Sequence, residues 1–188
     1  WLGSPRARSL MKTRGWSDIA QLQSHFLQRI QAVVTALGRK TGAWEEAAQG
    51  GGIDPAQSCL FAWTGPESGL ALAKAGYDVI AMPGTRYYLD IAQSIDWWEP
   101  GAAWAGTVPL DLTYNYDPGG DWPAEVAPRL KGIQAALWGE PLGREAGLIE
   151  YLLLPRLSAV AESAWTLAER KNFTRFLAMQ DLIPRSAF

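Results

Sequence analysis

The stretch TGAWEEAAQGGGIDPAQSCLFAWTGPESGLALAKAGYDVIAMPGTRYYLD, from Thr41 to Asp90, carries the pattern that decides the fold. Its apolar segments TGAWEE, SCLFAWT and YDVIAMPG are short and bounded by turn residues, so each is a predicted strand. A helix is predicted from about Pro66 to Ala75, between the second and third strands, and Gly76 would end it. GIQAALWG, residues 132–139, is a fourth predicted strand, separated from the third by the long loop Ile91–Leu130.

Helical patterns lie on both sides of this region. Apolar residues recur at helical spacing from Ile19 to Leu37, after Ser17 and Asp18, which are both suited to start a helix, and before Gly38, which predicts an amphipathic helix. A second helical stretch is expected from about Glu145 to Glu169, and Pro155 should break or restart it. Strands separated by helices favour parallel pairing over hairpins, so the fold class is α/β, and four such strands make half of a (β/α)8 barrel.

The composition bounds the class of protein. With 188 residues, of which 48% are hydrophobic and 19% charged, the chain is expected to form one globular unit. A net charge of -2 with no run of Lys or Arg gives no electrostatic case for nucleic acid or an anionic membrane surface, and no apolar run reaches membrane-spanning length. One cysteine, Cys59, excludes a disulfide within this chain and a cysteine-rich metal site, and one histidine, His25, cannot build a histidine triad for zinc. No cofactor is expected.

Four short runs place an aromatic residue beside a polar or acidic one where an apolar segment ends: AWEE (43–46), AWTG (62–65), YYLD (87–90) and LWGE (137–140). In parallel α/β folds, functional residues collect at the carboxyl ends of the strands. A pyranose offers apolar C–H faces to aromatic rings and a rim of hydroxyls to carboxylates. The runs therefore predict a sugar pocket, and the tryptophan-rich loop Ile91–Leu130 would form a wall or lid over it.

Together with WWEPG, WAG, GIQAALWGE and PRLSAVAESAW, these runs resemble, in order and spacing, the blocks of the family-20 glycoside hydrolases, the β-N-acetylhexosaminidases. The resemblance implies that residues 1–188 are the C-terminal part of a single (β/α)8 catalytic domain, about strands 5 to 8 with their helices, and that the N-terminal half of the barrel is absent. It implies hydrolysis of terminal non-reducing β-linked N-acetylglucosamine or N-acetylgalactosamine by a substrate-assisted retaining mechanism. The expected partners are β-N-acetylhexosaminide glycans or chitooligosaccharides, and the missing half of the barrel.

The resemblance assigns roles to four tryptophans. Trp44, Trp63 and Trp138 would line the pocket for the acetamide group, with Trp138 also under the sugar ring. Trp104 would border the pocket toward the leaving group.

Three polar residues receive roles in the same way. Tyr88 would donate a hydrogen bond to the acetamide oxygen as that oxygen becomes the nucleophile, which makes it the nearest residue here to a catalytic one. Asp90 and Glu140 would accept hydrogen bonds from the 4- and 6-hydroxyls of the sugar. The family's polarising and acid pair lies in a motif resembling His-x-Gly-Gly-Asp-Glu, which this sequence lacks, so the segment alone is expected to be inactive.

Each of these residues also has a purely structural interpretation. Tryptophans such as Trp44 are most often core or rim packing. Glu140 could start the following helix, and Asp90 could cap the turn into IAQSI. Glu45 and Glu46 could form no more than a solvated loop edge, which is the favoured interpretation of Glu46.

Two other functions fit the same residues. A catalytically dead, lectin-like relative would keep the aromatic and acidic residues and lack the Asp–Glu pair. A barrel glycosidase of another family, such as one acting on chitin internally, is a weaker possibility, because it would need a closely spaced acidic motif on the fourth barrel strand, which is expected outside this chain. From the residues alone, Glu46 and Glu140 could be taken for an ordinary acid and nucleophile pair, but the resemblance makes Glu140 a binding residue and leaves the acid upstream.

Overall fold

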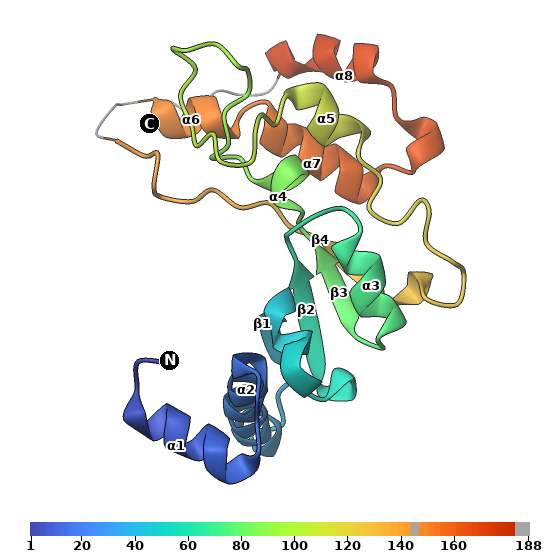
Figure 1. Ribbon diagram of the computed structural model, residues 1–188. Coiled ribbons are helices and arrows are strands. Elements are labelled where there is room, and N and C mark those ends of the chain that lie inside the picture. Colours follow the sequence, from blue (N-terminus) through green and yellow to red (C-terminus); the bar gives the residue numbers. More distant parts are fainter. Residues whose placement is uncertain (144–146, 183–188) are drawn as a thin grey trace. The chain divides into compact units, whose positions relative to one another are not determined.

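A computed structural model of the chain describes residues 1–143 and 147–182 (Figure 1). Its four strands are β1 (Thr41–Trp44), β2 (Ser58–Ala62), β3 (Asp78–Ala81) and β4 (Leu130–Ile133). They form one sheet in the order β1-β2-β3-β4, and β1 pairs with β2 in parallel, with Trp44 opposite Phe61. The predicted α/β fold with a parallel sheet is confirmed.

The chain divides into two compact units. The first comprises residues 1–63, 67–80 and 122–131, and the second comprises 64–66, 81–121 and the chain from 132 onward. Two of the boundaries fall within β3 and β4, and each unit is described by itself.

The core of the first unit forms around β2. Inward side chains alternate along this strand, so that Leu60 and Ala62 are buried, and α3 (Ser68–Lys74) packs on it with Leu72. Trp122, from the long loop, also packs against this core, and a Cβ on Gly69 would lie 3.1 Å from its ring. Trp122 is therefore a structural residue of this unit.

Two helices precede the sheet in the first unit: α1 (Pro5–Arg14) and α2 (Ile19–Ala36). The predicted start and end of α2 are confirmed, because Asp18 forms a capping box with Gln21 and Gly38 follows the helix with a φ of 69°. The face of α2 that packs against the segment after β1 is partly polar. Ser24 Oγ donates to the carbonyl oxygen of Gly52 at 2.9 Å, and Gln31 Nε2 donates to that of Asp54 at 3.1 Å.

These contacts hold the segment after β1, which forms the 3₁₀ turns η1 (Glu45–Gly51) and η2 (Pro55–Gln57). The apolar stripe that marks α2 as amphipathic lies on another side of the helix. Most of that stripe is exposed in this chain, namely Phe26, Ile30, Val33 and Leu37.

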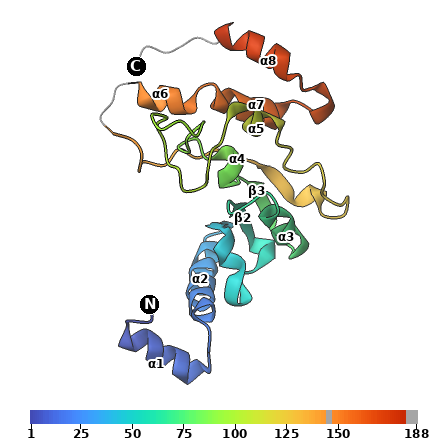
Figure 2. The ribbon, with the colours of Figure 1, turned by 45° about the horizontal axis from the view of Figure 1, so that its top comes forward.

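The second unit is mainly helical. It contains α4 (Gly84–Tyr87), α5 (Leu110–Asn115), α6 (Leu148–Leu153), α7 (Arg156–Trp165), η4 (Ala168–Arg170), α8 (Phe173–Met179) and η5 (Gln180–Leu182). The helix α5 packs against α7 in both views (Figures 1 and 2), and Tyr114, Ala159 and Phe176 form the core between α5, α7 and α8. None of the described helices has the length and apolar character needed to cross a membrane.

The structure confirms one predicted boundary and corrects two others. The stretch predicted as one helix from about Glu145 is divided at Pro155 into α6 and α7, as expected, although Glu145 itself lies outside the described residues. The long loop contains α5 and the 3₁₀ turn η3 (Ala127–Arg129). The fourth strand starts at Leu130 and ends at Ile133, so Trp138 lies beyond it.

The third aromatic run is also displaced from its strand, because α4 separates Tyr88 from β3. A short irregular ladder replaces the regular strand end. Leu89 N donates to the carbonyl oxygen of Ala136 at 2.7 Å, Ala136 N donates to that of Tyr87 at 3.0 Å, and Tyr88 and Ala136 form a parallel bridge. This ladder brings YYLD and LWGE side by side.

Candidate functional site

Three aromatic rings cluster in the second unit, where YYLD and LWGE meet. The Tyr88 ring lies edge-on to Trp138 at 5.8 Å and to Trp104 at 6.2 Å between centroids. Tyr88 is 4% exposed, whereas Trp104 and Trp138 are 64% and 38% exposed, so the tyrosine lies at the base and the tryptophans reach outward. A Cβ on Gly84 would lie 3.2 Å from the Tyr88 ring, so the start of α4 also packs on it.

Asp90 joins this cluster through the backbone. Its carboxylate is buried and accepts a hydrogen bond from the backbone N–H of Trp138 at 3.2 Å. Burial raises the pKa of Asp90, the bond from Trp138 opposes that shift, and the negative charge of Glu140 adds to the rise. The carboxylate therefore bonds to a residue far along the chain, and the alternative in which it only caps the next turn is not supported.

Glu140 is exposed and lies near enough to Asp90 for its negative charge to raise the pKa of the Asp90 carboxyl group. Among the described residues, 139–143 contain no helix, and the next helix is α6, which begins at Leu148. Glu140 therefore does not act as the first residue of a described helix, which removes one structural interpretation of this carboxylate.

Arg156 binds the backbone on both sides of Asp90, and the sequence did not predict this role. Its guanidinium is fully buried and donates to the carbonyl oxygens of Leu89 at 2.5 Å, Ile91 at 2.8 Å, Val108 at 3.0 Å and Leu152 at 2.8 Å. Burial lowers its pKa to about 10. Since two of these acceptors flank Asp90, Arg156 fixes the backbone that carries Tyr88 and Asp90. The arginine of the PRLSAVAESAW block was the available signal.

Gly101 allows the next segment to return to Asp90. Ala102 N donates to the Asp90 carbonyl oxygen at 2.7 Å, and Ala92 N donates to that of Ala102 at 2.9 Å. Gly101 has a φ of +124°, and a Cβ there would lie 2.7 Å from Ala92 N and 2.8 Å from the Asp90 carbonyl oxygen. Only glycine fits this position, so Gly101 is needed for the chain to return beside Asp90.

The first unit contains the remaining predicted aromatic residues, Trp44 and Trp63. Trp44 is the last residue of β1 and is 42% exposed. Its ring lies beside that of Phe61, with 5.9 Å between the ring centroids. Trp63 follows β2 and is half-buried. Its backbone N–H donates to Glu45 Oε2 at 2.8 Å, and its indole Nε1 donates to Glu46 Oε1 at 3.0 Å.

The interpretation of Glu46 as only a solvated loop edge is therefore wrong. The turn η1 starts immediately after β1, so both carboxylates face the neighbouring strand end, where Trp63 emerges. Together they fix the backbone and the side-chain orientation of Trp63.

The predicted site residues thus form two groups. Tyr88, Asp90, Trp104 and Trp138 are joined within the second unit, with Glu140 close by, and Trp44 and Trp63 belong to the first. His25 belongs to neither group, and its ring packs beside that of Trp16 with 5.2 Å between the ring centroids. The half-buried Cys59 belongs to neither group either. Across residues 1–143 and 147–182, the structure contains no cluster of three His, Cys, Asp or Glu side chains that could hold a metal ion.

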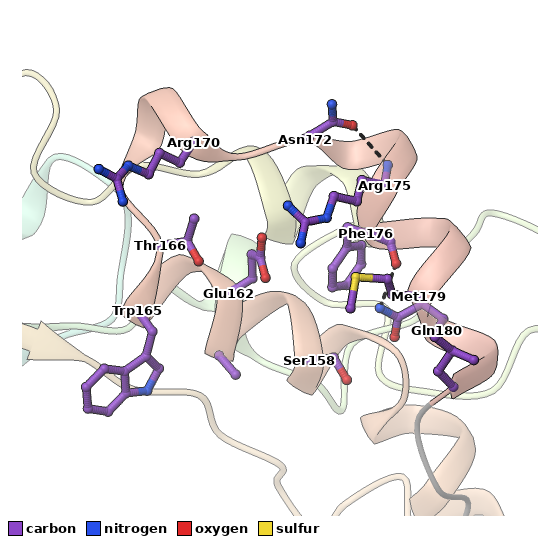
Figure 3. Close-up of a pocket in the computed structure, with 12 residues that line it drawn as sticks. Ser158, Glu162, Trp165, Thr166, Arg170, Asn172, Arg175, Phe176, Met179 and Gln180 are labelled. Carbon is purple, nitrogen blue, oxygen red and sulfur yellow. Dashed lines mark hydrogen bonds between the residues drawn. The ribbon is translucent and has the colours of Figure 1, made fainter.

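A cavity of about 740 Å³ lies elsewhere in the second unit, among α7, η4 and α8 (Figure 3). Glu162 on α7 and Arg175 on α8 face one another across it, and Phe176 closes one side. None of the predicted site residues lines this cavity, so it is separate from the candidate site.

Known proteins match the chain over most of its length. The model of glycosyl hydrolase family 20, catalytic domain, matches residues 1–168. The chain is 36% identical over 165 residues to a β-hexosaminidase of Vibrio furnissii, which covers 87% of this chain and 27% of that protein. It is 33% identical over 183 residues to a β-hexosaminidase of Porphyromonas gingivalis, which covers 96% of this chain and 23% of that protein.

A solved structure gives the same result for the fold. The family-20 exo-β-N-acetylglucosaminidase from Vibrio harveyi, in complex with N-acetylglucosamine, matches with a TM-score of 0.86 and 34% identity, over 96% of this chain and 28% of that chain. The chain therefore spans 23% to 28% of the length of these relatives.

Proposed function

Because the chain belongs to glycosyl hydrolase family 20, as a segment of its (β/α)8 catalytic domain, we propose that the protein hydrolyses terminal non-reducing β-linked N-acetylhexosamine. In this proposal the segment supplies the side of the pocket that holds the sugar and its acetamide group. The relatives from Vibrio furnissii and Porphyromonas gingivalis are β-hexosaminidases, and the Vibrio harveyi structure holds N-acetylglucosamine. The observation that carries the proposal is the joined cluster of Tyr88, Asp90 and Trp138.

Tyr88 is the residue that we propose acts on the reacting atoms. In a substrate-assisted reaction the acetamide oxygen attacks the anomeric carbon, the bond to the leaving oxygen breaks, and water later opens the cyclic intermediate with net retention. A phenolic O–H aimed at the acetamide oxygen favours the oriented nucleophile and lowers the barrier if the bond strengthens in the transition state. The Tyr88 ring makes edge-type contacts with both Trp104 and Trp138, which limits its motion and supports such an orientation.

The carboxylates are proposed to bind the sugar hydroxyls. Asp90 and Glu140 are anions in one neighbourhood, and each can accept hydrogen bonds from hydroxyls on the rim of a pyranose. Trp138 would lie under the apolar face of the ring, and Trp104 would border the leaving-group side. Trp44 and Trp63 would enclose the acetamide methyl group, with Glu45 and Glu46 fixing Trp63.

The acid and the polarising carboxylate are proposed to come from another part of the protein, because this sequence contains no His-x-Gly-Gly-Asp-Glu motif. Two observations support this proposal. The relatives are several times longer than the chain, and the apolar stripe of α2 is exposed over Phe26, Ile30, Val33 and Leu37, as expected for a surface covered by further protein. On this basis the 188-residue segment alone would be inactive.

The test uses the product of the whole reading frame that carries this chain. We expect it to hydrolyse 4-nitrophenyl N-acetyl-β-glucosaminide, to release the β-anomer first as followed by proton NMR, and to lose rate with an N-trifluoroacetyl substrate, whose acetamide oxygen is a weaker nucleophile. Initial release of the α-anomer would overturn the retaining mechanism. Binding of N-acetylglucosamine without hydrolysis would instead favour a lectin-like protein.

A further inference from the structure

Trp97 and Trp98 have no role in the site described above, although their loop is attached to it. The loop of residues 93–101 leaves the chain after Ala92 and returns at Ala102, and hydrogen bonds join its two ends to each other and to the Asp90 carbonyl oxygen. Ile91 and Ala102 also form a parallel bridge. The base of the loop is therefore joined to the backbone of the candidate site.

The tip is a turn with an unusual composition. Glu99 N donates to the Asp96 carbonyl oxygen at 2.9 Å, so Trp97 and Trp98 occupy the two central positions of a four-residue turn. Turn positions favour Gly, Pro, Asn, Asp and Ser, for conformational reasons that tryptophan does not satisfy. The turn therefore gives no reason for either tryptophan to be there.

Packing gives no reason either. Trp97 is 90% exposed and Trp98 is 65% exposed, and their rings meet edge-on at 5.6 Å between centroids. Leaving two large apolar rings in water is unfavourable unless a partner covers them, because each buries a large apolar area when it packs.

The loop is held in place before any partner arrives. Glu99 accepts hydrogen bonds from Gln93 N at 3.1 Å and from the Tyr151 hydroxyl on α6 at 2.8 Å. At the start of the turn, the Ser94 hydroxyl donates to Asp96 Oδ2 at 2.9 Å and accepts from Asp96 N at 3.2 Å. A platform fixed in this way loses little conformational entropy when it binds a ligand.

We propose that Trp97 and Trp98 form a stacking platform for the sugar units of a β-linked N-acetylhexosamine oligosaccharide that lie beyond the hydrolysed bond. This inference rests on the proposed function, because an enzyme that holds the terminal unit beside Asp90 leaves the following units to extend out of the pocket. The loop that carries the platform is bonded at its base to the Asp90 carbonyl oxygen, and Trp104 of the ring cluster follows the loop by three residues, so the chain ties the platform to the candidate site. The apolar C–H face of each pyranose unit would stack on an indole ring, while Asp96 at the turn offers a carboxylate to its hydroxyls.

The experiment compares substrates of different length with the product of the whole reading frame. The substrates are 4-nitrophenyl N-acetyl-β-glucosaminide, which has no second sugar, and chitooligosaccharides of two to five units. The variants are Trp97→Ala, Trp98→Ala and the double variant. The control is Trp165→Ala, which removes another tryptophan that is 90% exposed and lies on α7 in the same unit.

We expect kcat/KM in the parent to rise with chain length by about tenfold, equivalent to about 1.4 kcal/mol. The double variant should lose this rise, while its kcat/KM for the nitrophenyl substrate and its thermal midpoint stay those of the parent. Trp165→Ala should keep the rise. An unchanged length dependence in the double variant overturns the inference, and so does an equal loss on every substrate.

A binding measurement separates this inference from the proposed function. Calorimetric titration with N-acetylglucosamine and with a thio-linked analogue of chitotetraose, which resists hydrolysis, does not depend on turnover, so it applies whether or not the protein is active. Tighter binding of the thio-linked analogue, lost in the double variant by about tenfold, supports the platform. Equal affinities in parent and double variant overturn it, as does a double variant that mainly lowers the thermal midpoint or dissociates an oligomer, because the tryptophans would then be covered by protein.

Discussion

Replacement of Arg156 by Met is the most informative test of how the candidate site is held. The guanidinium makes four hydrogen bonds to backbone carbonyl oxygens, and two of these flank Asp90. Hydrogen bonds from a charged donor contribute about 1.5–3 kcal/mol each, so four amount to about 6–12 kcal/mol before the cost of burying the cation is counted. That cost is several kcal/mol, and each buried carbonyl oxygen left without a donor costs about 1–3 kcal/mol, so we expect Arg156→Met to lower the free energy of unfolding by roughly 3–5 kcal/mol.

The measurement is urea unfolding followed by circular dichroism, on Arg156→Met, Arg156→Lys and the parent. Lys keeps the charge but lacks the planar fork of donors, so it should recover only part of the loss. Arg170→Met removes an exposed arginine of the same unit and should change the free energy of unfolding by less than about 0.5 kcal/mol. If Arg156→Met lowered stability by no more than this control, or if Lys replaced Arg without loss, the assignment of Arg156 as the support of this backbone would be wrong.

Three further predictions concern the cluster itself. Burial raises the pKa of Asp90, so its ionised carboxylate disfavours folding at neutral pH. In urea titrations Asp90→Asn should therefore be more stable than the parent at pH 7, by a difference that shrinks toward pH 3, and its affinity for N-acetylglucosamine should fall. Equal stability differences at both pH values would contradict this. In the whole protein, Tyr88→Phe should lower kcat by about 10²-fold with little change in KM, and a rise in KM alone would make Tyr88 a binding residue only. Gly101→Ala should lower the free energy of unfolding by about 2–3 kcal/mol in thermal melts, and Gly106→Ala, which also has a positive φ but open space around it, should cost only the backbone part, about 1 kcal/mol.

Local patterns predicted the elements that depend on local causes. The helix Ile19–Ala36 and the strand Ser58–Ala62 were predicted because capping residues, glycines and apolar spacing are properties of adjacent residues. The short helix α5 was missed, because six residues between two irregular stretches carry too little periodicity to be recognised.

The support of the site depends on residues far apart in the sequence. Arg156 reaches carbonyl oxygens up to 67 residues away, and Trp63 is fixed by carboxylates 17 and 18 residues before it. Backbone carbonyls carry no mark in the sequence, so neither partnership could be derived from spacing. The motifs predicted which residues would hold a sugar, but not which residues fix those side chains in place.

The two bonds from Glu45 and Glu46 to Trp63 also matter for anyone who wants to change the substrate. Enlarging the proposed acetamide pocket to admit a bulkier N-acyl group would begin with a smaller residue in place of Trp63. That single change would remove the indole N–H and leave Glu46 Oε1 without this donor beside the new space. A library that varies position 63 alone would therefore consist mostly of variants in which Glu46 has lost this hydrogen-bond donor. Positions 46 and 63 should be varied together, because their side chains are hydrogen-bonded to each other.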